Sequence, residues 1–419
     1  MKAKVFLKIA WRNVQRNRRR SLITIAAISL GLASLIFFGA INDGFNEQMV
    51  RSSVRLMIGH IQIHRQGYQD DPDVEKFITH PDRYMAVLKD LPYPIYYAPR
   101  VKFQGLISSP ENSYGVYVVG IAPAAEATVS TINRAVIEGK FLNNDGHLSH
   151  SLLLGKQLAK NLKTGIGDKV VLMTQAYDGS LSASAFTIQG IFRTGNPEMD
   201  KGAVYIPIEA AQSMLAYEDK ISEIVILTDR EEQVNKVKEL IMDGVIKITQ
   251  GTDAAMEILE WSDIAPDIVQ IVKINDITMY ILLGILFIIV TLGIINTLLM
   301  SIFERTWEIG IIMAIGTSPG YVVLMLIMEA MFLGFIGIIL GLIIGVFITG
   351  YYNQQGIDLS KFSEGLALYL GLETTLYPVI KLKSLAIYTL AIFLTTILAS
   401  LYPAVKAAWL RPIEAIRHV

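Results

Sequence analysis

The sequence contains no cysteine among its 419 residues. This excludes disulfide bonds, thiol catalysis, cysteine-ligated metals and a lipid-modified cysteine on this chain. Charged residues are also scarce, at 18% of the chain, whereas soluble domains carry about 25%. The formal net charge of −1 does not favour a nucleic-acid partner. Hydrophobic residues instead make up 52% of the chain and the mean hydropathy is +0.43, which together indicate a membrane protein.

Catalytic signatures are missing as well. Gly155-Lys156 is followed by Gln157 and lacks the upstream glycine of a phosphate-binding loop. Neither a Gly-x-Ser-x-Gly turn nor a His-Glu-x-x-His helix occurs. His60 and His64 could form a metal-binding pair on one strand face, but Gln62 shares that face, so a polar strand face is the favoured interpretation. We therefore expect no enzyme activity, metal or cofactor on this chain itself.

Four runs are long and apolar enough to cross a membrane, which requires about 20 residues. They are residues 21–42, 277–303, 321–350 and 384–405. The first exceeds the apolar core of about 7–15 residues found in cleaved signal peptides and follows a long basic region, so a signal anchor is the better interpretation. The sequence therefore predicts a membrane α-helical protein with four transmembrane helices.

Positive charge predicts the orientation of these spans. Eight Lys and Arg residues precede the first span, and no acidic residue occurs before Asp43. We therefore expect both termini in the cytoplasm, including the tail 406–419. Alternation then places residues 43–276 and the loop 351–383 outside, and residues 304–320 inside.

Residues 1–20 have their own pattern. Apolar residues such as Phe6, Ala10 and Trp11 recur at helical spacing, while Lys8 and Arg12 lie on the opposite face. This pattern predicts a cytoplasmic amphipathic helix in the membrane interface. A disordered basic leader that only determines topology is the alternative.

The segment 43–276 is predicted to be an inserted α+β domain. Strands are expected at 60–64, 114–121, 168–174, 186–192, 203–206 and 223–228, and helices at 123–130, 155–162, 208–217 and 231–242. Its length suits two subdomains, one from about 51–120 with 221–270 and the other inserted at 121–220. Residues 252–276 look helical and lead into the second span, with a break expected at Pro266.

The third span carries two features of its own. Glu329 is an intramembrane charge, for which a structural role is favoured over proton relay: it would accept hydrogen bonds from the 304–320 segment or a neighbouring helix. A stripe of small residues on the same helix predicts close helix packing. Its members are Gly334, Gly337, Gly341 and Gly345. Packing inside one subunit and packing across a dimer axis are both open.

The short cytoplasmic segment 304–316 is acidic at its start and carries an apolar helical stripe. The stripe contains Trp307, Ile311, Ala314 and Ile315, and the segment ends at Gly316-Thr317-Ser318-Pro319. Such a helix can dock in a groove of another protein. An interfacial helix without a partner is the alternative.

The motifs of the chain resemble one known family over nearly its whole length. They are Ala10-Trp11-Arg12-Asn13, Glu304-Arg305-Thr306-x-Glu308-Ile309-Gly310-Ile311-x-x-Ala314-Ile315-Gly316, Glu329-Ala330, the glycine stripe, and Pro403-Ala404-x-x-Ala407-Ala408-x-x-Arg411-Pro412. In the insert they are Val119-Gly120-Ile121, Leu154-Gly155-Lys156 and Tyr205-Ile206-Pro207. This set resembles the FtsX-like, MacB- and Lol-type (type VII, mechanotransmission) permeases of ABC transporters. Residues 59–64 and Gly67-Tyr68 look most like the lipoprotein-releasing branch.

The resemblance implies a function in which the chain moves no substrate through a channel. It implies one span, a periplasmic domain with porter (51–120 and 221–270) and sabre (121–220) subdomains, and then three spans in a bacterial inner membrane. Residues 304–320 would form the coupling helix on a cytoplasmic ATPase subunit, which binds ATP and Mg²⁺. A second permease copy or paralogue, membrane lipids, and a lipoprotein substrate or periplasmic partner are the other implied partners.

One departure bears on the branch. One type of lipoprotein-releasing permease carries an extended loop that recruits a periplasmic carrier, whereas the loop 175–185 is short, small and polar. Recruitment of a carrier is therefore not expected. Lipoprotein or lipid-linked substrate release is the favoured function. Drug or peptide export, regulation of cell-wall hydrolases, and a membrane regulator that moves no substrate are the alternatives.

Overall fold

The computed structural model describes residues 18–143, 150–249, 255–358 and 375–409. Most of the predicted amphipathic helix 1–20 and most of the tail lie outside the described residues. The chain forms two compact units. One contains residues up to Glu47, Val272–Asp358 and the segment from Thr375, and is built from long helices. The other, from Gln48 to Ile271, is the α+β insert.

Four helices in the described part of the chain are long and apolar enough to cross a membrane. They are α2 (Arg18–Ser53), α10 (Pro266–Glu304), α12 (Pro319–Gln355) and α14 (Leu382–Ala408). The short helix α11 (Thr306–Ala314) separates α10 from α12. Each predicted span lies within one of these helices. The helices continue beyond the apolar runs, and α2 extends to Ser53. The predicted span ended earlier because a polar extension of a helix leaves no hydropathy signal.

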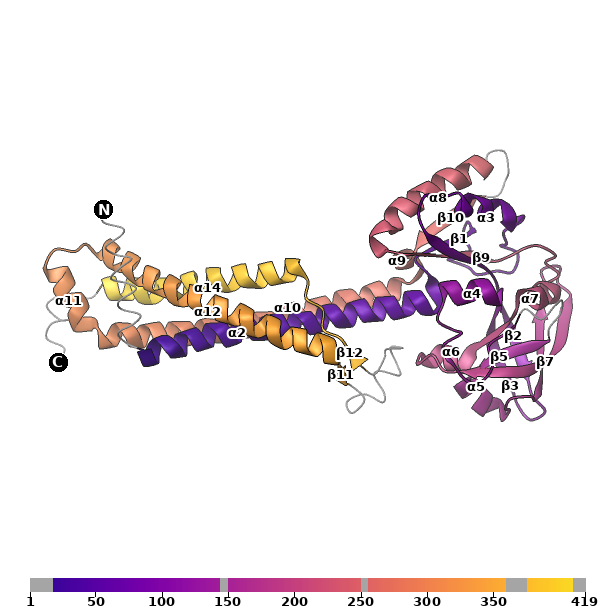
Figure 1. Cartoon of the computed structure of the whole chain (residues 1–419), viewed down its shortest axis with the longest axis horizontal. Helices are drawn as coiled ribbons and strands as arrows, with labels where there is room; N and C mark the ends of the chain where they lie inside the picture. The colour runs from indigo at the N-terminus through magenta and orange to yellow at the C-terminus, as the bar shows by residue number, and fades with distance from the viewer. Residues whose placement is uncertain (1–17, 144–149, 250–254, 359–374, 410–419) are drawn as a thin grey trace. The chain divides into compact units, whose positions relative to one another are not determined.

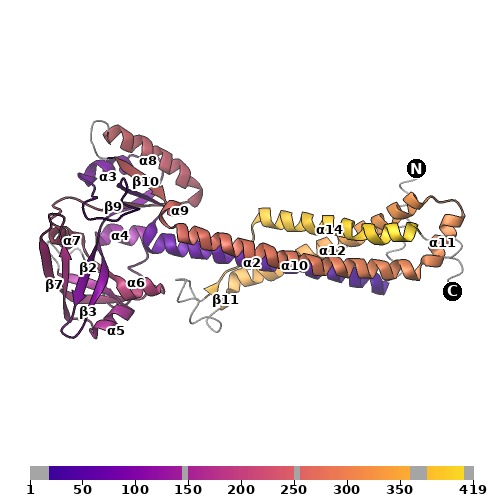
Figure 2. The same cartoon turned by 180° about the vertical axis from the view of Figure 1, so that it is seen from behind.

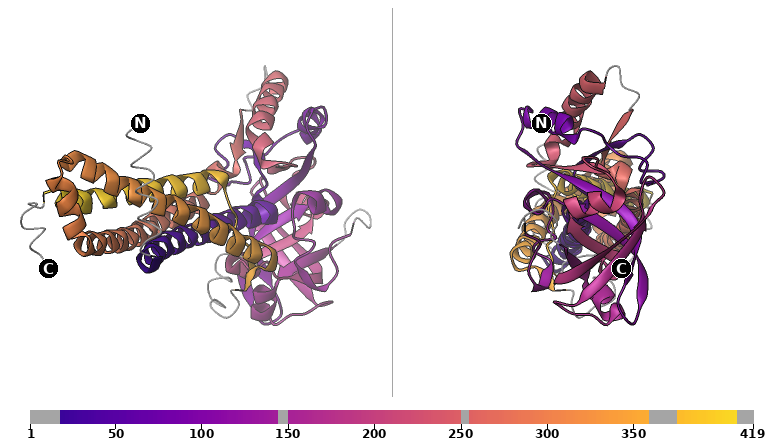
Figure 3. Two further views of the ribbon diagram at one scale, coloured as in Figure 1. Left: turned by 60° about the vertical axis from the view of Figure 1, so that its left-hand side comes forward. Right: turned by 90° about the vertical axis from the view of Figure 1, so that its right-hand side faces the viewer.

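The helical unit is held together along a shared apolar core. Ile28, Leu32, Val290, Ile338 and Ile392 contribute to it from all four long helices. Helices α12 and α14 pack against each other, as Figures 1 and 2 and the left-hand view of Figure 3 show. At one end, Asn42 and Asn46 of α2 donate hydrogen bonds to Asp276 of α10, at 3.0 and 2.9 Å.

The insert is built on one ten-stranded mixed sheet with the order β10-β1-β9-β2-β3-β8-β5-β7-β4, while β6 pairs with β2 and β7. The strands are β1 (Ile61–Arg65), β2 (Ile95–Ser108), β3 (Ser113–Ile121), β4 (Val136–Gly139), β5 (Ser151–Gly155), β6 (Lys169–Gln175), β7 (Leu181–Phe192), β8 (Ala203–Pro207), β9 (Glu223–Thr228) and β10 (Met256–Glu260). Among the strand pairs that the structure describes in this sheet, β3 with β8 and β5 with β7 are parallel and the others antiparallel. The long strand β2 pairs with β9 near its start and with β6 near its end, so strands from both predicted subdomains share one sheet.

Short helices cover the sheet of the insert. They are α3 (Pro81–Lys89), α4 (Pro123–Val129), α5 (Lys156–Leu162), α6 (Pro197–Gly202), α7 (Ile208–Leu215), α8 (Val234–Thr249) and α9 (Trp261–Ile264). Helices α3 and α8 pack together, as Figure 1 shows, and Val87 contacts Gly244 there. One core cluster joins Ile61, Val118, Leu158 and Ile226, which lie on both sides of the predicted subdomain boundaries.

Two expectations for the insert were wrong. The described part of the segment 252–276 is not a single helix: Met256–Glu260 forms β10, paired with β1, and α10 begins only at Pro266, where the break was expected. The expected loop 175–185 is mostly strand, because β6 and β7 pair as far as Gln175 opposite Leu181. Only residues 176–180 form the turn.

Candidate functional site

The predicted coupling segment forms a short helix that begins directly after α10. Glu304 is the last residue of α10, Arg305 precedes α11, and Gly316 follows its end with φ +103°. Ile309 and Gly310 are buried, and Ile309 packs against Val322 and Ala404. Helix α11 is therefore attached to the ends of α10, α12 and α14.

The Arg305 side chain fixes this helix to the third span. Its Nη1 donates to Glu329 Oε2 at 3.1 Å and to Oε1 at 3.4 Å, and its Nε donates to Glu308 Oε2 at 3.2 Å. Arg305 is 8% and Glu329 1% exposed. The structural interpretation of Glu329 expected a hydrogen bond from the 304–320 segment or from a neighbouring helix, and the contact with Arg305 is of the first kind. A buried ion pair of this kind constrains both elements, because separating the charges is costly.

The opposite face of α11 carries exposed apolar side chains. Trp307 is 52% and Ile315 81% exposed, although both are large and apolar. Ala314 and Glu304 are exposed too, whereas Thr306 and Ile311 are half-buried. Large aromatic side chains at exposed helical positions are typical anchors of protein interfaces. Within the part of the chain that the structure describes, the apolar stripe is therefore only partly buried.

The glycine stripe of α12 is used inside this chain. A Cβ added at Gly337 would lie 2.8 Å from Ile28, and one at Gly341 would lie 2.9 Å from Leu32 and from the Ser29 carbonyl oxygen. Gly345 faces Ile36 and Ala33 in the same way, and Gly334 faces Thr396 of α14. The stripe thus allows α2 and α14 to approach α12 closely. Of the two packing arrangements left open, the one within a subunit exists in the structure.

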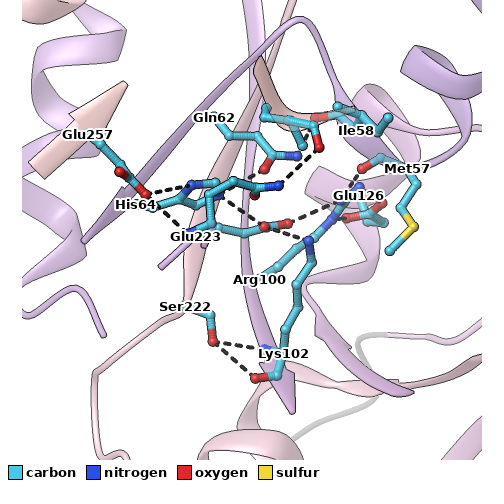
Figure 4. Close-up of polar contacts among 12 residues, drawn as sticks. Met57, Ile58, Gln62, His64, Arg100, Lys102, Glu126, Ser222, Glu223 and Glu257 are labelled. Carbon is cyan, nitrogen blue, oxygen red and sulfur yellow. Dashed lines mark hydrogen bonds and ion pairs between the residues drawn. The ribbon is translucent and has the colours of Figure 1, made fainter. Parts of the chain in front are cut away.

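A buried ionic network lies in the insert and was not predicted from the sequence (Figure 4). Arg100 of β2 donates to both carboxylate oxygens of Glu126 on α4, at 2.9 and 2.6 Å, and to Glu223 of β9 at 3.3 Å. Lys102 donates to Glu223 at 2.5 Å. Arg100, Glu126 and Glu223 are at most 2% exposed. The only available signal was a pair of charges inside the apolar strand β2, which does not identify their partners.

The network is electrostatically balanced, with two cations against two carboxylates. Burial opposes the charge on Glu223, but Lys102, a hydrogen bond from His64 and the Arg100 guanidinium hold the pKa of that carboxyl well below its usual range. Burial lowers the pKa of Lys102, and the Glu223 carboxylate counteracts this. Buried charges are tolerated only when paired in this way.

The two histidines considered as a metal pair are buried and bound by protein groups. His60 Nδ1 accepts the backbone N–H of Thr228 at 3.1 Å, and His64 Nε2 lies 2.8 Å from Gln62 Oε1 and 3.4 Å from Glu223. His64 is fully buried and His60 is 8% exposed, so this face of β1 is interior rather than solvated. No group of three metal-ligating side chains occurs among the residues that the structure describes.

Acidification is expected to destabilise the insert through His60. Burial, and secondly the charge of Arg55, lower the pKa of His60 from 6.5 to about 4. In the unfolded chain His60 binds a proton near pH 6.5, whereas in the folded chain it stays neutral until the pH is much lower. The contribution of His60 to the free energy of unfolding is therefore fully present above pH 6.5. It is then lost as the pH falls towards 4, by at most about 1.4 kcal/mol per pH unit.

Thermal unfolding of the purified chain at several pH values tests this expectation. The variant His60→Gln should show a weaker decrease of the melting temperature below pH 6.5 than the wild-type chain. His80→Gln is the matched control, because its side chain is 65% exposed. Identical pH profiles for the wild-type chain and His60→Gln would contradict the assignment.

An apolar groove of about 560 Å³ lies in the insert. The groove is lined by the end of α2, by the turn that follows α2, by strands β2 and β3, by α6 and by the start of α10. The lining residues include Ser52, Leu56, Met57, Gly105, Gly115, Val116, Tyr117, Met199 and Ile268. Its size falls in the range of small-molecule sites, about 300–1,000 Å³. Met57 also accepts a hydrogen bond from Arg100 through its carbonyl oxygen, so the groove borders the ionic network.

Comparison with known proteins yields two family matches. Residues 21–243 match the MacB-like periplasmic core domain, and residues 280–412 match the FtsX-like permease C-terminal model. The lipoprotein-releasing system transmembrane protein LolC of Neisseria meningitidis is 23% identical over 95% of this chain and 94% of its own length. LolE of Haemophilus influenzae is 23% identical over 97% of this chain and 98% of its own length.

A relative that is named for a different function is also similar. The macrolide export ATP-binding/permease protein MacB of Campylobacter jejuni is 24% identical over 98% of this chain, which covers 60% of that protein. Among solved structures, the periplasmic region of MacB from Actinobacillus actinomycetemcomitans matches 52% of this chain and 94% of its own, with 14% identity and a TM-score of 0.37.

The fold and these sites define a class: a multi-pass membrane protein with an α+β domain inserted after its first long apolar helix. The chain belongs to the family that carries the MacB-like periplasmic core domain, and its C-terminal part is an FtsX-like permease.

Proposed function

We propose that this chain is the permease subunit of an ABC transporter and couples ATP hydrolysis on a separate ATPase subunit to motion of its inserted domain. The observation that carries the proposal is the exposed apolar face of α11, with Trp307 and Ile315, on a helix that Arg305 fixes to the membrane helices. A partner that pushes on this face would displace α10, α12 and α14 together. No nucleotide-binding loop occurs in the sequence, so the ATP is bound by the partner.

The substrate that we propose is a lipoprotein or another lipid-linked molecule, released from the outer leaflet of the inner membrane. Support comes from the similarity to LolC and LolE over nearly their whole lengths. Among the described residues, Glu329 is paired with Arg305, and no row of intramembrane charges marks a hydrophilic path there. Because MacB is also similar, export is the competing function. Reconstitution with a purified triacylated lipoprotein or a macrolide separates the two.

The finer arrangement belongs to the same proposal. We place both termini in the cytoplasm, the insert in the periplasm, and one span before the insert with three after it. The insert would act as porter and sabre subdomains joined by the pairing of β2 with β6 and of β3 with β8. A second permease copy or a paralogue would complete the complex with two ATPase subunits.

Replacing Trp307 by alanine is expected to weaken binding of the ATPase subunit. Truncating an aromatic anchor at an interface costs about 2 kcal/mol or more, which corresponds to roughly 30-fold in affinity. Trp307 is a sharper target than Glu308, because Arg305 already binds the Glu308 carboxylate and Glu308→Lys would also disturb this internal pair. The measurement is co-purification with the ATPase subunit, followed by titration of ATPase stimulation.

The matched control for this experiment is Ile289→Ala. Ile289 is an apolar side chain of α10 that is 60% exposed, and it belongs to the apolar run predicted to cross the membrane. This variant should bind the ATPase subunit as the wild-type chain does. If Trp307→Ala and Ile315→Ala both bind and stimulate the ATPase normally, α11 is not the coupling helix.

A further inference from the structure

The end of helix α2 in the insert is an unusual turn. After Ser53 the chain continues as a π-helix, η1 (Val54–Ile58), which ends at Gly59 with φ +72°. π-Helical turns are rare and frequently mark functional sites. The last carbonyl groups of a helix have no partner within the helix, so they must bind elsewhere.

Three carbonyl groups of η1 are bound by three different parts of the insert. The Thr131 backbone N–H, just after α4, donates to the Arg55 oxygen at 2.9 Å. The Gln62 side chain of β1 donates to the Ile58 oxygen at 2.5 Å. Arg100 Nη1 donates to the Met57 oxygen. The latter two contacts are drawn in Figure 4 together with the ionic network.

Arg100 differs from the other two donors because it is itself held rigidly. Its guanidinium makes four hydrogen bonds, two to Glu126, one to Glu223 and one to Met57. A guanidinium offers five donors in a planar fork, whereas a lysine offers three from one nitrogen. Lysine at this position could not reach both carboxylates and the η1 carbonyl oxygen with the same geometry.

We propose that Arg100 is the positioning residue that fixes the end of α2 to the sheet and to α4, so that a displacement of this helix is passed to the whole insert. Without Arg100, the π-helical turn would absorb the displacement. The apolar groove depends on the same contact, since Leu56 and Met57 of η1 line it. This inference rests on the proposed function, which requires α2 to transmit motion. The first test of the inference, a distance measurement on the chain alone, does not depend on that function.

The test uses the absence of cysteine in the chain, which allows unique labelling at introduced cysteines. Spin labels are placed at Arg51→Cys on α2 and Lys160→Cys on α5, both exposed positions. The distance distribution between them is measured in detergent by electron-electron double resonance. The wild-type background should give one narrow distance. In Arg100→Met/Glu126→Gln, which removes the cation and one carboxylate charge together, the distribution should be about two-fold broader.

Controls separate this effect from general damage to the fold. Lys163→Met/Glu111→Gln removes an exposed ion pair of 2.6 Å that touches no residue of η1, and should keep the narrow distance. Arg100→Lys keeps the charge but not the fork, and should also broaden the distribution. If the double variant does not fold, Arg100→Lys decides. If the folded variant that is measured gives the same narrow distance distribution as the wild-type background, the proposal is overturned.

A second measurement tests transmission in the complex with the ATPase subunit. A fluorescent dye at Lys160→Cys should respond to ATP and vanadate in the wild-type background, and the response should be lost in Arg100→Lys while the ATPase rate is kept. A normal response in Arg100→Lys would again overturn the proposal. If the wild-type complex does not form or does not hydrolyse ATP, the proposed function fails, whereas the distance measurement in detergent still stands.

Discussion

Replacing Arg305 by methionine is expected to destabilise the helical unit by about 3–5 kcal/mol, because it removes the guanidinium that pairs with the buried Glu329 carboxylate. Glu329 is 1% exposed, and Arg305 Nη1 is its charged partner at 3.1 Å. The change is read as a lower melting temperature in detergent and as a smaller yield of monodisperse protein. Loss of the ATPase stimulation should accompany it, since α11 would no longer be fixed to α12.

Two further variants show that the pair, rather than either residue alone, is responsible. Glu329→Gln retains an oxygen that can accept from Arg305, so it should cost only about 1–2 kcal/mol. In Arg305→Met/Glu329→Leu both charges are gone, and much of the stability should return, because an apolar replacement of a buried ion pair is often tolerated. This recovery is the double-mutant measurement of the coupling.

A control and a contrary outcome complete the experiment. Lys381→Met removes a pair with Asp43 at 3.5 Å in the same unit, but Lys381 is half exposed, so the cost should stay below about 1 kcal/mol. If Glu329→Gln assembles normally but abolishes activity, the residue carries a proton and the structural assignment is wrong. If Arg305→Met is as stable as the wild-type chain, the ion pair contributes nothing.

The membrane part of the fold was predictable because each span is a single local feature. An apolar run such as 321–350 must become a helix in lipid, whatever its neighbours, since no other local structure satisfies its backbone groups. The structure places α12 around this run, from Pro319 to Gln355. The contact between Arg305 and the buried Glu329 was one of two expected arrangements, because either the 304–320 segment or a neighbouring helix could supply the hydrogen bond.

The insert was less predictable because its elements are defined by distant partners. Met256–Glu260 reads as helix in isolation but becomes a strand because β1 offers an unpaired edge. Likewise, Arg100 and Glu126 are separated by 26 residues, and Arg100 and Glu223 by 123. No local pattern brings these charges together, so the ionic network and the contact with η1 follow only from the tertiary fold.

Substituting Gly341 by leucine is expected to have the largest effect of any single change in the glycine stripe. A Cβ at this position would lie 2.9 Å from both Leu32 Cβ and the Ser29 carbonyl oxygen, and 3.1 Å from Ser29 Cα. Two of these atoms belong to the α2 backbone, which cannot move aside as a flexible side chain can. Overpacking of a core lowers the free energy of unfolding by about 1–3 kcal/mol and occasionally more. A branched side chain pressed against backbone atoms is expected at the upper end of this range.

The matched control is a glycine on a helix face that nothing in the described structure covers. Gly293 of α10 has no atom within 4 Å of its added Cβ, so Gly293→Leu should leave the melting temperature nearly unchanged. Gly341→Ala should fall between the two, because its methyl group meets the same atoms with less bulk. The measurement is thermal unfolding in detergent, with oligomeric state determined on the same samples.

The oligomeric state decides between the two packing arrangements that the stripe permits. If the stripe serves packing within the subunit, Gly341→Leu lowers the melting temperature of the monomeric chain as well as that of any assembly. If it served a dimer axis, the same variant would dissociate the assembly and leave the isolated chain as stable as before. A Cβ added at Gly337, Gly341 or Gly345 would lie 2.8 or 2.9 Å from the nearest atom of α2, so we expect the first result. Close contact with α2 would then make α12 and the first span move as one body.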